Sequence, residues 1–391
     1  MIEIKDKKLC SGCGACYTTC PTHAISMESD EEGFLYPKVD LDKCIHCNLC
    51  EQICPILNGR TKKEEYPADF PVVYAAYISN DEIRSKSSSG GIFYALAIEV
   101  LSKKGIVVGA SFQEDFSVSH QIITKIDEIP LLQGSKYVQS NINGNEKLLF
   151  FKIKEYLLKD KLVLFSGTSC QIAGLKSYLR KDFVNLICID LICKGIPSPL
   201  IWKSYLNYIS PKHDISSINF KSKKYGWNLF SVQFLEKSKR IEHIGKFDPY
   251  MQLFFKGLTL RPVCYACPFK GRERLSDITL SDCWGYDKFA LDLFDNYGLS
   301  SVFIHTSKGL KIWNSISANL KYKQVDFENA IQFNENFYQS AQIPTSRQEF
   351  YLDYYRMNFN KLLNKYAKVN FRDALDAYKM LLKYKLKGRK K

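Results

Sequence analysis

The sequence has no apolar run close to the roughly 18 residues that a membrane-spanning helix needs, so we expect no transmembrane segment. The first ten residues, MIEIKDKKLC, also lack the apolar stretch of a secretory signal peptide. Acidic residues are few relative to basic ones, 41 against 55, which gives a formal net charge of +14. With 46% hydrophobic and 25% charged residues, the chain is predicted to be a soluble, cytoplasmic, globular protein.

Acidic residues are also missing after Asp376, and this local absence accounts for much of the positive charge. The lysines and arginines of this end are Lys379, Lys383, Lys385, Lys387, Arg389, Lys390 and Lys391. Tyr351, Tyr354 and Tyr355 fall in a helix-like run and are expected to pack, so we expect no nucleic-acid partner. We predict a basic helical tail that is solvated, docks an acidic redox partner or makes peripheral membrane contact.

Cysteine, in contrast, is abundant, with 14 residues in a chain too long to need disulfides for folding. CSGCGACYTTCP (10–21) and CIHCNLCEQICP (44–55) repeat the spacing C-x2-C-x2-C-x3-C-P. This spacing is typical of bacterial ferredoxins, in which the fourth cysteine of each run crosses to the other [4Fe–4S] cluster. Paired zinc knuckles would have no use for that crossing cysteine. The expected ligand sets are Cys10, Cys13, Cys16 and Cys54 for one cluster, and Cys44, Cys47, Cys50 and Cys20 for the other.

An α/β pattern follows a polar, proline-marked linker. VVYAAYI and IVVGASF are expected to be strands, and apolar residues between them recur at helical spacing from Ser89-Gly90-Gly91 onward. Small residues at a helix N-terminus suit a diphosphate, although such residues also cap helices that bind nothing. Lys136 and Tyr137 follow a glycine turn, where the lysine suits either a phosphate or plain solvent.

Six further cysteines lie in this second part. Cys170 and Cys193 each follow a predicted strand, so they converge at one sheet edge if the two strands are parallel neighbours. With the pair Cys264 and Cys267 they provide four thiolates, enough for a third [4Fe–4S] cluster or, equally, for zinc. Cys188, further back along its strand, is expected in the core. We expect Cys283 to pack near the site.

Six motifs carry a family resemblance: SSSGG, QGSKYVQS, FSGTSCQIAGL, DLICKGIPSP, FDPYMQLFFKGLTLRPVCYACPFK and SDITLSDCWG. They resemble the family of β-subunits of coenzyme F420 hydrogenases and dehydrogenases, of which plant 7-hydroxymethyl chlorophyll a reductase looks like a relative. The resemblance implies an α/β flavoprotein that binds FAD beside a [4Fe–4S] cluster held by Cys170, Cys193, Cys264 and Cys267. The implied flavin residues are Ser88, Ser89, Gly90, Gly91, Gly134, Ser135, Lys136 and Tyr137. Two positions depart from the family pattern: Lys194 stands where relatives usually have histidine, and Ser169 where they usually have proline.

The predicted function is that of an iron–sulfur flavoprotein oxidoreductase, which passes electrons between ferredoxin-type clusters, a third [4Fe–4S] cluster and FAD. The flavin would exchange hydride with an F420-like or other organic substrate, and Lys136, Lys194 and Asp282 are candidate proton carriers. The alternative is an electron-transfer subunit that reduces only a protein partner. The expected fold is an α+β ferredoxin-like module, an α/β flavoprotein domain with a mixed sheet, and a helical C-terminal tail. Its expected boundaries are 1–58 for the ferredoxin domain, 59–71 for the linker, 72–155 and 156–345 for the two parts of the β-subunit-like region, and 346–391 for the tail.

Overall fold

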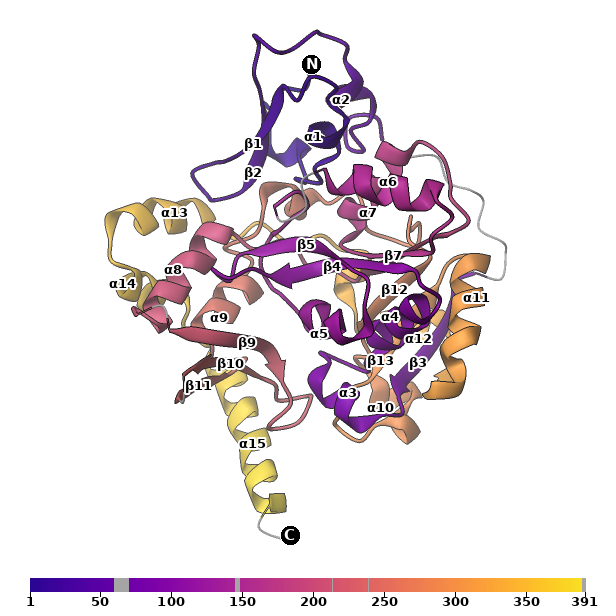
Figure 1. Ribbon diagram of the computed structural model, residues 1–391. Coiled ribbons are helices and arrows are strands. Elements are labelled where there is room, and N and C mark those ends of the chain that lie inside the picture. The colour runs from indigo at the N-terminus through magenta and orange to yellow at the C-terminus, as the bar shows by residue number, and fades with distance from the viewer. Residues whose placement is uncertain (60–69, 145–147, 213, 238, 389–391) are drawn as a thin grey trace.

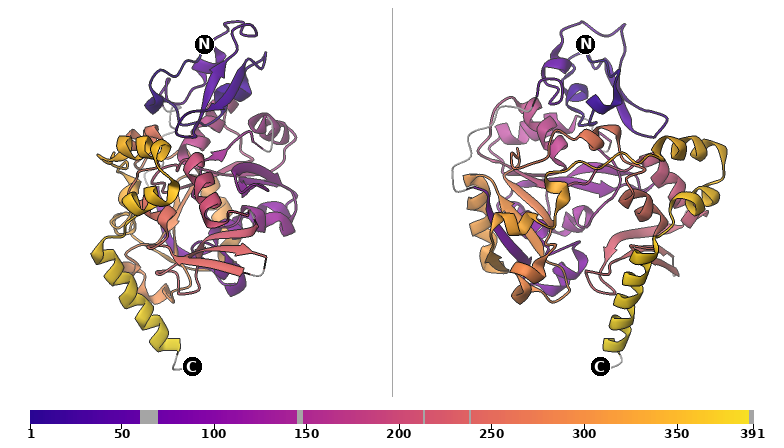
Figure 2. Two further views of the ribbon diagram at one scale, coloured as in Figure 1. Left: turned by 90° about the vertical axis from the view of Figure 1, so that its left-hand side faces the viewer. Right: turned by 180° about the vertical axis from the view of Figure 1, so that it is seen from behind.

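The computed structural model describes residues 1–59, 70–144, 148–212, 214–237 and 239–388 (Figure 1). Most of the expected linker, 59–71, lies outside these described residues. A small N-terminal unit stands on a larger body, and the C-terminal helix leaves the body at the opposite end in all three views (Figures 1 and 2).

The N-terminal unit consists of a hairpin and short helical turns. Strands β1 (Ile25–Ser29) and β2 (Leu35–Val39) pair antiparallel about a turn at residues 30–33. The helical turns are η1 (Lys7–Leu9), α1 (Ala15–Thr19) and α2 (Leu49–Gln52). Gly14 and Asn48 precede α1 and α2 with left-handed backbone angles, and both helices therefore begin just after a sharp turn within a cysteine run.

Nine strands of the described residues form one mixed sheet in the body, as the α/β prediction expects. Strands β4, β7, β8 and β12 run parallel as neighbours, while β13, β3 and β14 add antiparallel strands at one end. At the other end β5 pairs antiparallel with β4 and parallel with β6. In sheet order the strands are β14 (Leu320–Gln324), β3 (Val72–Ile78), β13 (Ser300–Ile304), β12 (Ile278–Asp282), β8 (Leu186–Leu191), β7 (Val163–Ser166), β4 (Ile106–Phe112), β5 (Val118–Ile123) and β6 (Ser140–Asn141).

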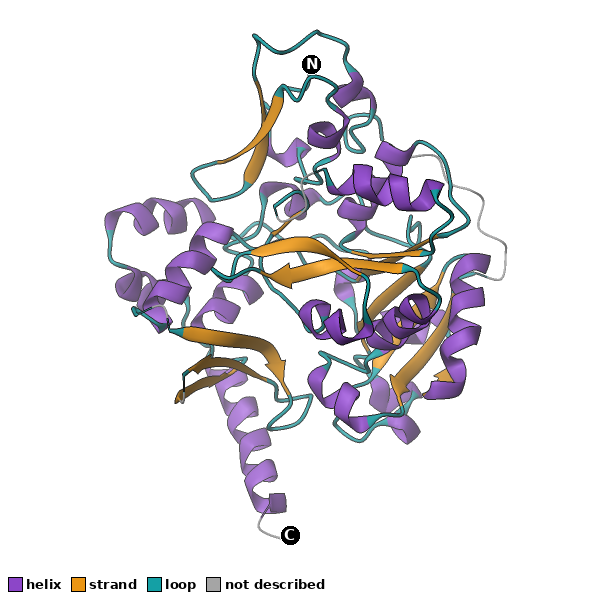
Figure 3. Ribbon diagram, in the orientation of Figure 1, coloured by secondary structure: helices purple, strands orange, loops and turns teal. Residues whose placement is uncertain are grey.

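Helices cover both faces of this sheet (Figure 3). Because successive strand residues point to opposite faces, Val107 packs with α4 (Ile92–Ser102) and α11 (Ser307–Ile316), whereas Val108 packs with α6 (Leu149–Leu158) and α7 (Ser169–Leu179). Cys188 is fully buried on the α6 and α7 face, which confirms its predicted place in the core. The shorter helical segments of the body are α3 (Asp81–Lys86), η2 (Ile126–Glu128), α5 (Ile129–Leu132), α10 (Tyr286–Phe289), η4 (Leu291–Leu293), η5 (Ser317–Asn319), α12 (Phe327–Ile331) and η6 (Glu335–Phe337).

A second sheet of three antiparallel strands lies beside the first and is covered by helices. Its strands are β9 (Ile215–Ser222), β10 (Ser231–Glu236) and β11 (Lys239–Ile244). An aromatic-rich core joins this sheet to the helices α8 (Pro199–Ile209), α9 (Pro249–Phe255), α13 (Arg347–Arg356) and α14 (Phe359–Tyr366). The last helix, α15 (Phe371–Gly388), confirms the predicted helical C-terminal region.

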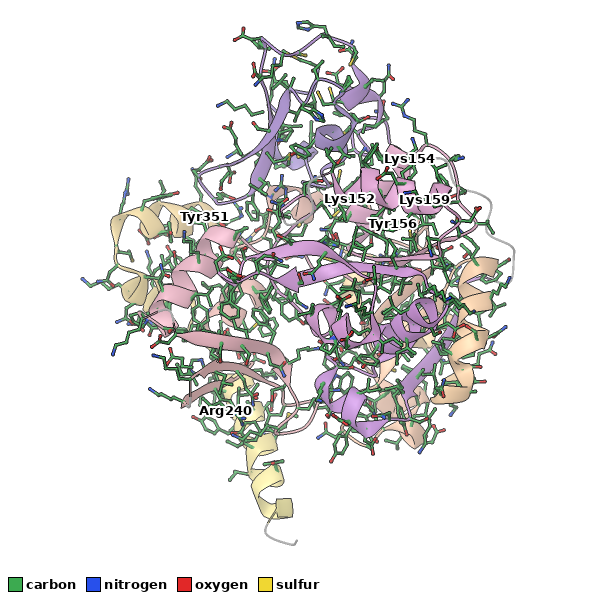
Figure 4. All side chains as sticks on the ribbon, in the orientation of Figure 1. Lys152, Lys154, Tyr156, Lys159, Arg240 and Tyr351 are labelled. Atoms are coloured by element: carbon green, nitrogen blue, oxygen red, sulfur yellow. The ribbon has the colours of Figure 1, made fainter. Side chains whose placement is uncertain are left out.

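The tyrosines of α13 and the apolar side chains of α15 vary in burial. Tyr351, labelled in Figure 4, is buried as expected, but Tyr355 is 62% exposed, with its ring against Tyr354 and its hydroxyl donating to the Glu31 carbonyl. On α15, Tyr378 contacts Phe247 while much of its surface stays exposed. No described helix is both long enough and apolar enough to cross a bilayer.

Close backbone contact joins the N-terminal unit to the body, and α1 packs on α6 and α7. Gly174 of α7 faces Cys13: a Cβ at Gly174 would lie 2.7 Å from Cys13 Cβ and 2.9 Å from its Sγ. At the hairpin turn, Glu32 forms a two-pronged ion pair with Arg347 of α13. The cysteine loop thus rests directly on the helix that carries Cys170.

We expect Gly174→Ala to lower the unfolding free energy by about 1–3 kcal/mol, because the added methyl group overpacks the contact with Cys13. Alanine is otherwise the better helix former, so without the clash the same change would stabilise α7. Gly109→Ala is the control, since its Cβ would meet only Leu132 carbons at 3.4 Å or more. Thermal unfolding of the two variants measures the difference, and a Gly174→Ala variant as stable as the parent would contradict the contact.

Candidate metal and cofactor sites

The cysteines of the N-terminal unit gather in two groups. One cavity of about 350 Å³ is lined by Cys20, Cys44, Cys47 and Cys50, so the structure brings Cys20 to the second cysteine run. Two backbone N–H groups point at sulfurs of this set, Ile2 N at 3.2 Å from Cys50 Sγ and Ala24 N at 3.2 Å from Cys20 Sγ. Such N–H groups stabilise thiolates or metal-bound sulfur. All residues that line this outer cavity belong to the N-terminal unit, and Cys47 among them is exposed.

The other four cysteines of the unit form the inner group. Burial, with a smaller contribution from the charges of Cys10 and Cys54, raises the pKa of the Cys13 thiol to about 12. Burial and the same neighbours raise the pKa of Cys16. Cys54 therefore lies with the first cysteine run, as the crossing pattern predicts. Thiols this buried are protonated near neutral pH unless a metal ion replaces the proton.

A larger cavity of about 440 Å³, partly open to solvent, lies in the body. Cys170, Cys193, Cys264 and Cys267 all line it, and so does Ser11 of the N-terminal unit. The strand arrangement explains the convergence, because β7 and β8 are parallel neighbours and the chain turns into the cavity at the carboxyl end of each. Cys264 lies on η3 (Pro262–Ala266), and Cys267 is the residue that directly follows this helix.

The thiols of this body cavity are buried as well. Burial raises the pKa of Cys264 to about 12 and raises the pKa of Cys170 and Cys193, with neighbouring cysteines adding to each shift. Ile196 N donates to Cys264 Sγ at 3.3 Å. Within the described ranges, no three His, Cys, Asp or Glu side chains close on the position of a single metal ion. The four sulfurs instead line the wall of a common space.

Positive side chains complete the wall of the body cavity, namely Lys194, Lys270 and Arg274. Arg274 is 3% exposed, and its Nη1 donates to Asp190 at 3.1 Å and to Ser169 Oγ at 2.9 Å. Its Nη2 has no hydrogen-bond partner among the residues that the structure describes. Four thiolates, three cations and an unused buried N–H donor fit a negatively charged iron–sulfur cluster.

Ser169 and Lys194, the two departures from the family pattern, both belong to this wall. Ser169 Oγ donates to Asp190 Oδ2 at 2.6 Å, so it joins the buried ion pair rather than the thiols. Lys194 Nζ donates to the Phe255 carbonyl at 2.8 Å, and burial lowers its pKa. Asp190 and Arg274 carry no local sequence signal, and reasoning from the sequence did not find them.

The candidate flavin residues lie on two loops that the structure brings together. Ser135 N and Oγ donate to Ser88 Oγ at 2.7 and 2.8 Å, which joins segments 47 residues apart. Gly91 is the N-cap of α4 and provides no side-chain cap, so the first N–H groups of this helix are available to an anion. Lys223 Nζ donates to the Ser89 carbonyl at 2.7 Å, and burial lowers the pKa of this amine to about 7. The segment fits the phosphates of a dinucleotide, although none of the eight candidates lines either cavity.

The three candidate proton carriers are not brought to one place. Burial lowers the pKa of Lys136 to about 7, and its Nζ donates to carbonyls at the end of α5, including Gln133 O at 3.1 Å. Asp282 forms an ion pair with Lys221 of β9, a residue that no sequence pattern indicated. Lys194 lines the body cavity instead. Cys283, expected near the cavity, does not line it, because its backbone pairs with Leu299 and its side chain is buried beside α10.

Models of known protein families match most of the chain. A family model described as "4Fe-4S dicluster domain" matches residues 9–57. Two models for the beta subunit of coenzyme F420 hydrogenase/dehydrogenase match as well. The model of its N-terminal part matches residues 73–144 and the model of its C-terminal part matches residues 160–329, together more than half of the chain.

Among curated proteins, the chain is 22% identical over 204 residues to one of the subunits of F(420)H(2) dehydrogenase from Methanosarcina mazei, covering 49% of the chain and 55% of that protein. It is 22% identical over 324 residues to coenzyme F420-dependent sulfite reductase of Methanocaldococcus jannaschii, covering 80% of the chain and 47% of that protein. The chain thus spans about half the length of these two relatives. A solved chain of the F420-reducing [NiFe] hydrogenase complex from Methanosarcina barkeri aligns at 16% identity and a TM-score of 0.45, covering 70% of this chain and 93% of that one.

Proposed function

The chain belongs to the family of coenzyme F420 hydrogenase/dehydrogenase beta subunits, and from this premise we propose that it is an iron–sulfur flavoprotein oxidoreductase. It passes electrons between a redox partner, two [4Fe–4S] clusters in the N-terminal unit, a third cluster in the body cavity and FAD. An organic two-electron substrate, of the F420 type or another, completes the path.

One observation carries this proposal: the N-terminal unit and the body share the wall of the cysteine-lined cavity. Ser11 lies between Cys10 and Cys13 in the sequence and lines the body cavity with Cys170 and Cys264. On the other side of the unit, Cys47 of the outer set is exposed. The three cysteine groups therefore run from the protein surface to the body, which suits electron exchange with a partner at the outer end.

The residues of the body cavity have separate roles in this proposal. Its four cysteines hold the third cluster, and Arg274, whose Nη2 has no hydrogen-bond partner among the described residues, lines the same space. Asp190 holds the Arg274 guanidinium in place, and Ser169 Oγ bonds to both. Ser169 thereby takes part in orienting the cation, which gives this departure from the family pattern a physical role.

FAD, when bound, converts single-electron transfer into two-electron chemistry on an organic substrate. We assign its phosphates to the loop of Ser88–Gly91, where α4 begins and the Lys223 amine donates to the Ser89 carbonyl. Ser135 fixes the second loop against the first through Ser88. The amine of Lys136 can hold or release a proton near neutral pH, because burial lowers its pKa to about 7.

The test is the content of iron, acid-labile sulfide, zinc and released flavin per chain in protein purified without oxygen. Three four-iron clusters require about twelve irons, and we expect one FAD beside them. A content of about eight irons together with zinc would mean that the third site holds zinc instead of a cluster. Twelve irons without flavin would favour the alternative, a subunit that reduces only a protein partner. An iron-free, flavin-free chain would overturn the proposal.

A further inference from the structure

Arg261 is fully buried where the N-terminal unit meets the body. It comes from the body, one residue before η3, yet its guanidinium reaches the first cysteine loop. Nε donates to the Cys10 carbonyl at 2.8 Å, and Nη2 donates to the Leu35 carbonyl at 2.9 Å and to Cys10 Sγ at 3.4 Å. The guanidinium carbon lies 4.1 Å from the ring centroid of Tyr36.

The partners of Arg261 differ from those of the buried Arg84 and Arg274 and of the half-buried Arg347. Arg84, Arg274 and Arg347 each form an ion pair with a carboxylate, from Asp295, Asp190 and Glu32 respectively. The oxygens that accept from Arg261 belong to two peptide carbonyls and, at 3.5 Å, to the amide of Gln139. A buried cation is costly unless a negative charge compensates it, and neutral oxygens do so only in part. The remaining partner, Cys10 Sγ, is a predicted cluster ligand.

The packing around Arg261 holds its charge at this place. A Cβ on Gly12 would lie 3.1 Å from Nη1, so the glycine leaves room for the guanidinium inside the cysteine loop. Cys264 N donates to the Arg261 carbonyl at 2.9 Å, which anchors the same residue to the body cavity. Arg261 therefore stands between the inner cysteine group and the cavity that holds Cys264.

We propose that Arg261 is the counter-cation of the cluster bound at Cys10 and that it raises the reduction potential of that cluster. The inference rests on the proposed function, because it requires the cluster to be present. Reduction adds one negative charge to the cluster, and a cation that donates to a ligand sulfur in a low-dielectric site favours the reduced form. Arg261 is thus a positioning residue for electron transfer and takes no part in the chemistry of the substrate.

The test is a redox titration, followed by electron paramagnetic resonance, of the full chain purified without oxygen. Arg261→Gln removes the charge but keeps an amide. We expect it to lower the equilibrium constant for reduction of one cluster at least tenfold, which is a fall of about 59 mV in the midpoint potential of a one-electron couple. We expect Arg261→Lys, which keeps the charge but loses the planar set of donors, to lower this equilibrium constant by a smaller factor. The other clusters should titrate as in the parent.

Arg347→Gln is the matched control. Arg347 also joins the N-terminal unit to the body, through Glu32, and donates to the carbonyl of Leu260, next to Arg261. It donates to no cysteine in any of its hydrogen bonds among the described residues. Arg347→Gln should therefore loosen the same contact without moving a midpoint potential.

The iron content separates the possible failures. Unchanged potentials in an Arg261→Gln chain that keeps the iron of the parent overturn the inference and leave the proposed function intact. Equal shifts in Arg261→Gln and Arg347→Gln also overturn it, since the effect then belongs to the contact. If Arg261→Gln loses iron, the Arg261→Lys variant decides the question. A lowered midpoint potential in an Arg261→Lys chain with full iron content supports the inference, and an unchanged potential overturns it. A parent chain without clusters overturns the proposed function itself.

Discussion

Replacing Cys264 with serine is expected to remove about four irons per chain, the content of one [4Fe–4S] cluster. Cys264 lines the body cavity, is 6% exposed and accepts a hydrogen bond from Ile196 N through its sulfur. Serine keeps the size of the side chain but replaces a soft thiolate by a hard, weakly acidic hydroxyl, which iron in a cluster binds poorly. Iron and sulfide analysis of protein purified without oxygen gives the answer directly.

Cys283→Ser is the matched control for this experiment. Cys283 is also fully buried, but it packs beside Ala75 and Leu299 and does not line the cysteine cavity. The iron content of the Cys283→Ser protein should equal that of the parent. If Cys264→Ser kept all of its iron, the body cavity would not hold a cluster; if both variants lost the same iron, the loss would reflect unfolding.

The second large effect concerns the buried ion pair of Asp190 and Arg274. We expect Asp190→Ala to lower the unfolding free energy by about 3–5 kcal/mol, because it leaves the Arg274 cation buried without a counter-charge. Hydroxyl groups of Ser276 and Thr279, which donate to Asp190 Oδ1, would lose their acceptor as well. The shift of the urea midpoint, measured without oxygen, reports the loss.

Two further variants make this measurement specific. The double change Asp190→Leu with Arg274→Met should recover most of the lost stability, because it removes the charge together with its partner. Lys86→Ala breaks an exposed pair with Glu82 and should leave the midpoint unchanged. An Asp190→Ala chain that unfolds at the urea concentration of the parent would show that solvent reaches Arg274.

Local patterns predicted the elements that local chemistry determines. The strands at 72–78 and 106–112 fall where VVYAAYI and IVVGASF stand, and α4 begins directly after the predicted glycines. Cysteine spacing predicted which thiols gather, because a short loop between ligands restricts where their sulfurs can lie. The convergence of Cys170 and Cys193 followed from one assumption, parallel neighbouring strands, which the sheet satisfies.

Residues that act through distant contacts were beyond the reach of sequence patterns. Arg261 meets Cys10, and Lys221 meets Asp282, across separations that depend on how whole elements pack. Cys283 directly follows β12 and was expected near the cavity, but its side chain packs beside α10 and does not line the cavity. Sequence position indicated which edge of the sheet the residue reaches, whereas packing determined the direction of its side chain.

The order of strands in the large sheet has a consequence for synthesis of the chain. Strand β3 leaves the ribosome early, yet its two neighbours are β13 and β14, so that Ala76 pairs with Ser300 and Tyr322. Until those later strands are made, VVYAAYI has apolar side chains and unpaired peptide groups on both edges. Sheets with such distant pairings fold slowly and are prone to aggregate while incomplete. We therefore expect a nascent or truncated chain that stops short of β13 to aggregate or to bind chaperones rather than to fold as a smaller version of the protein.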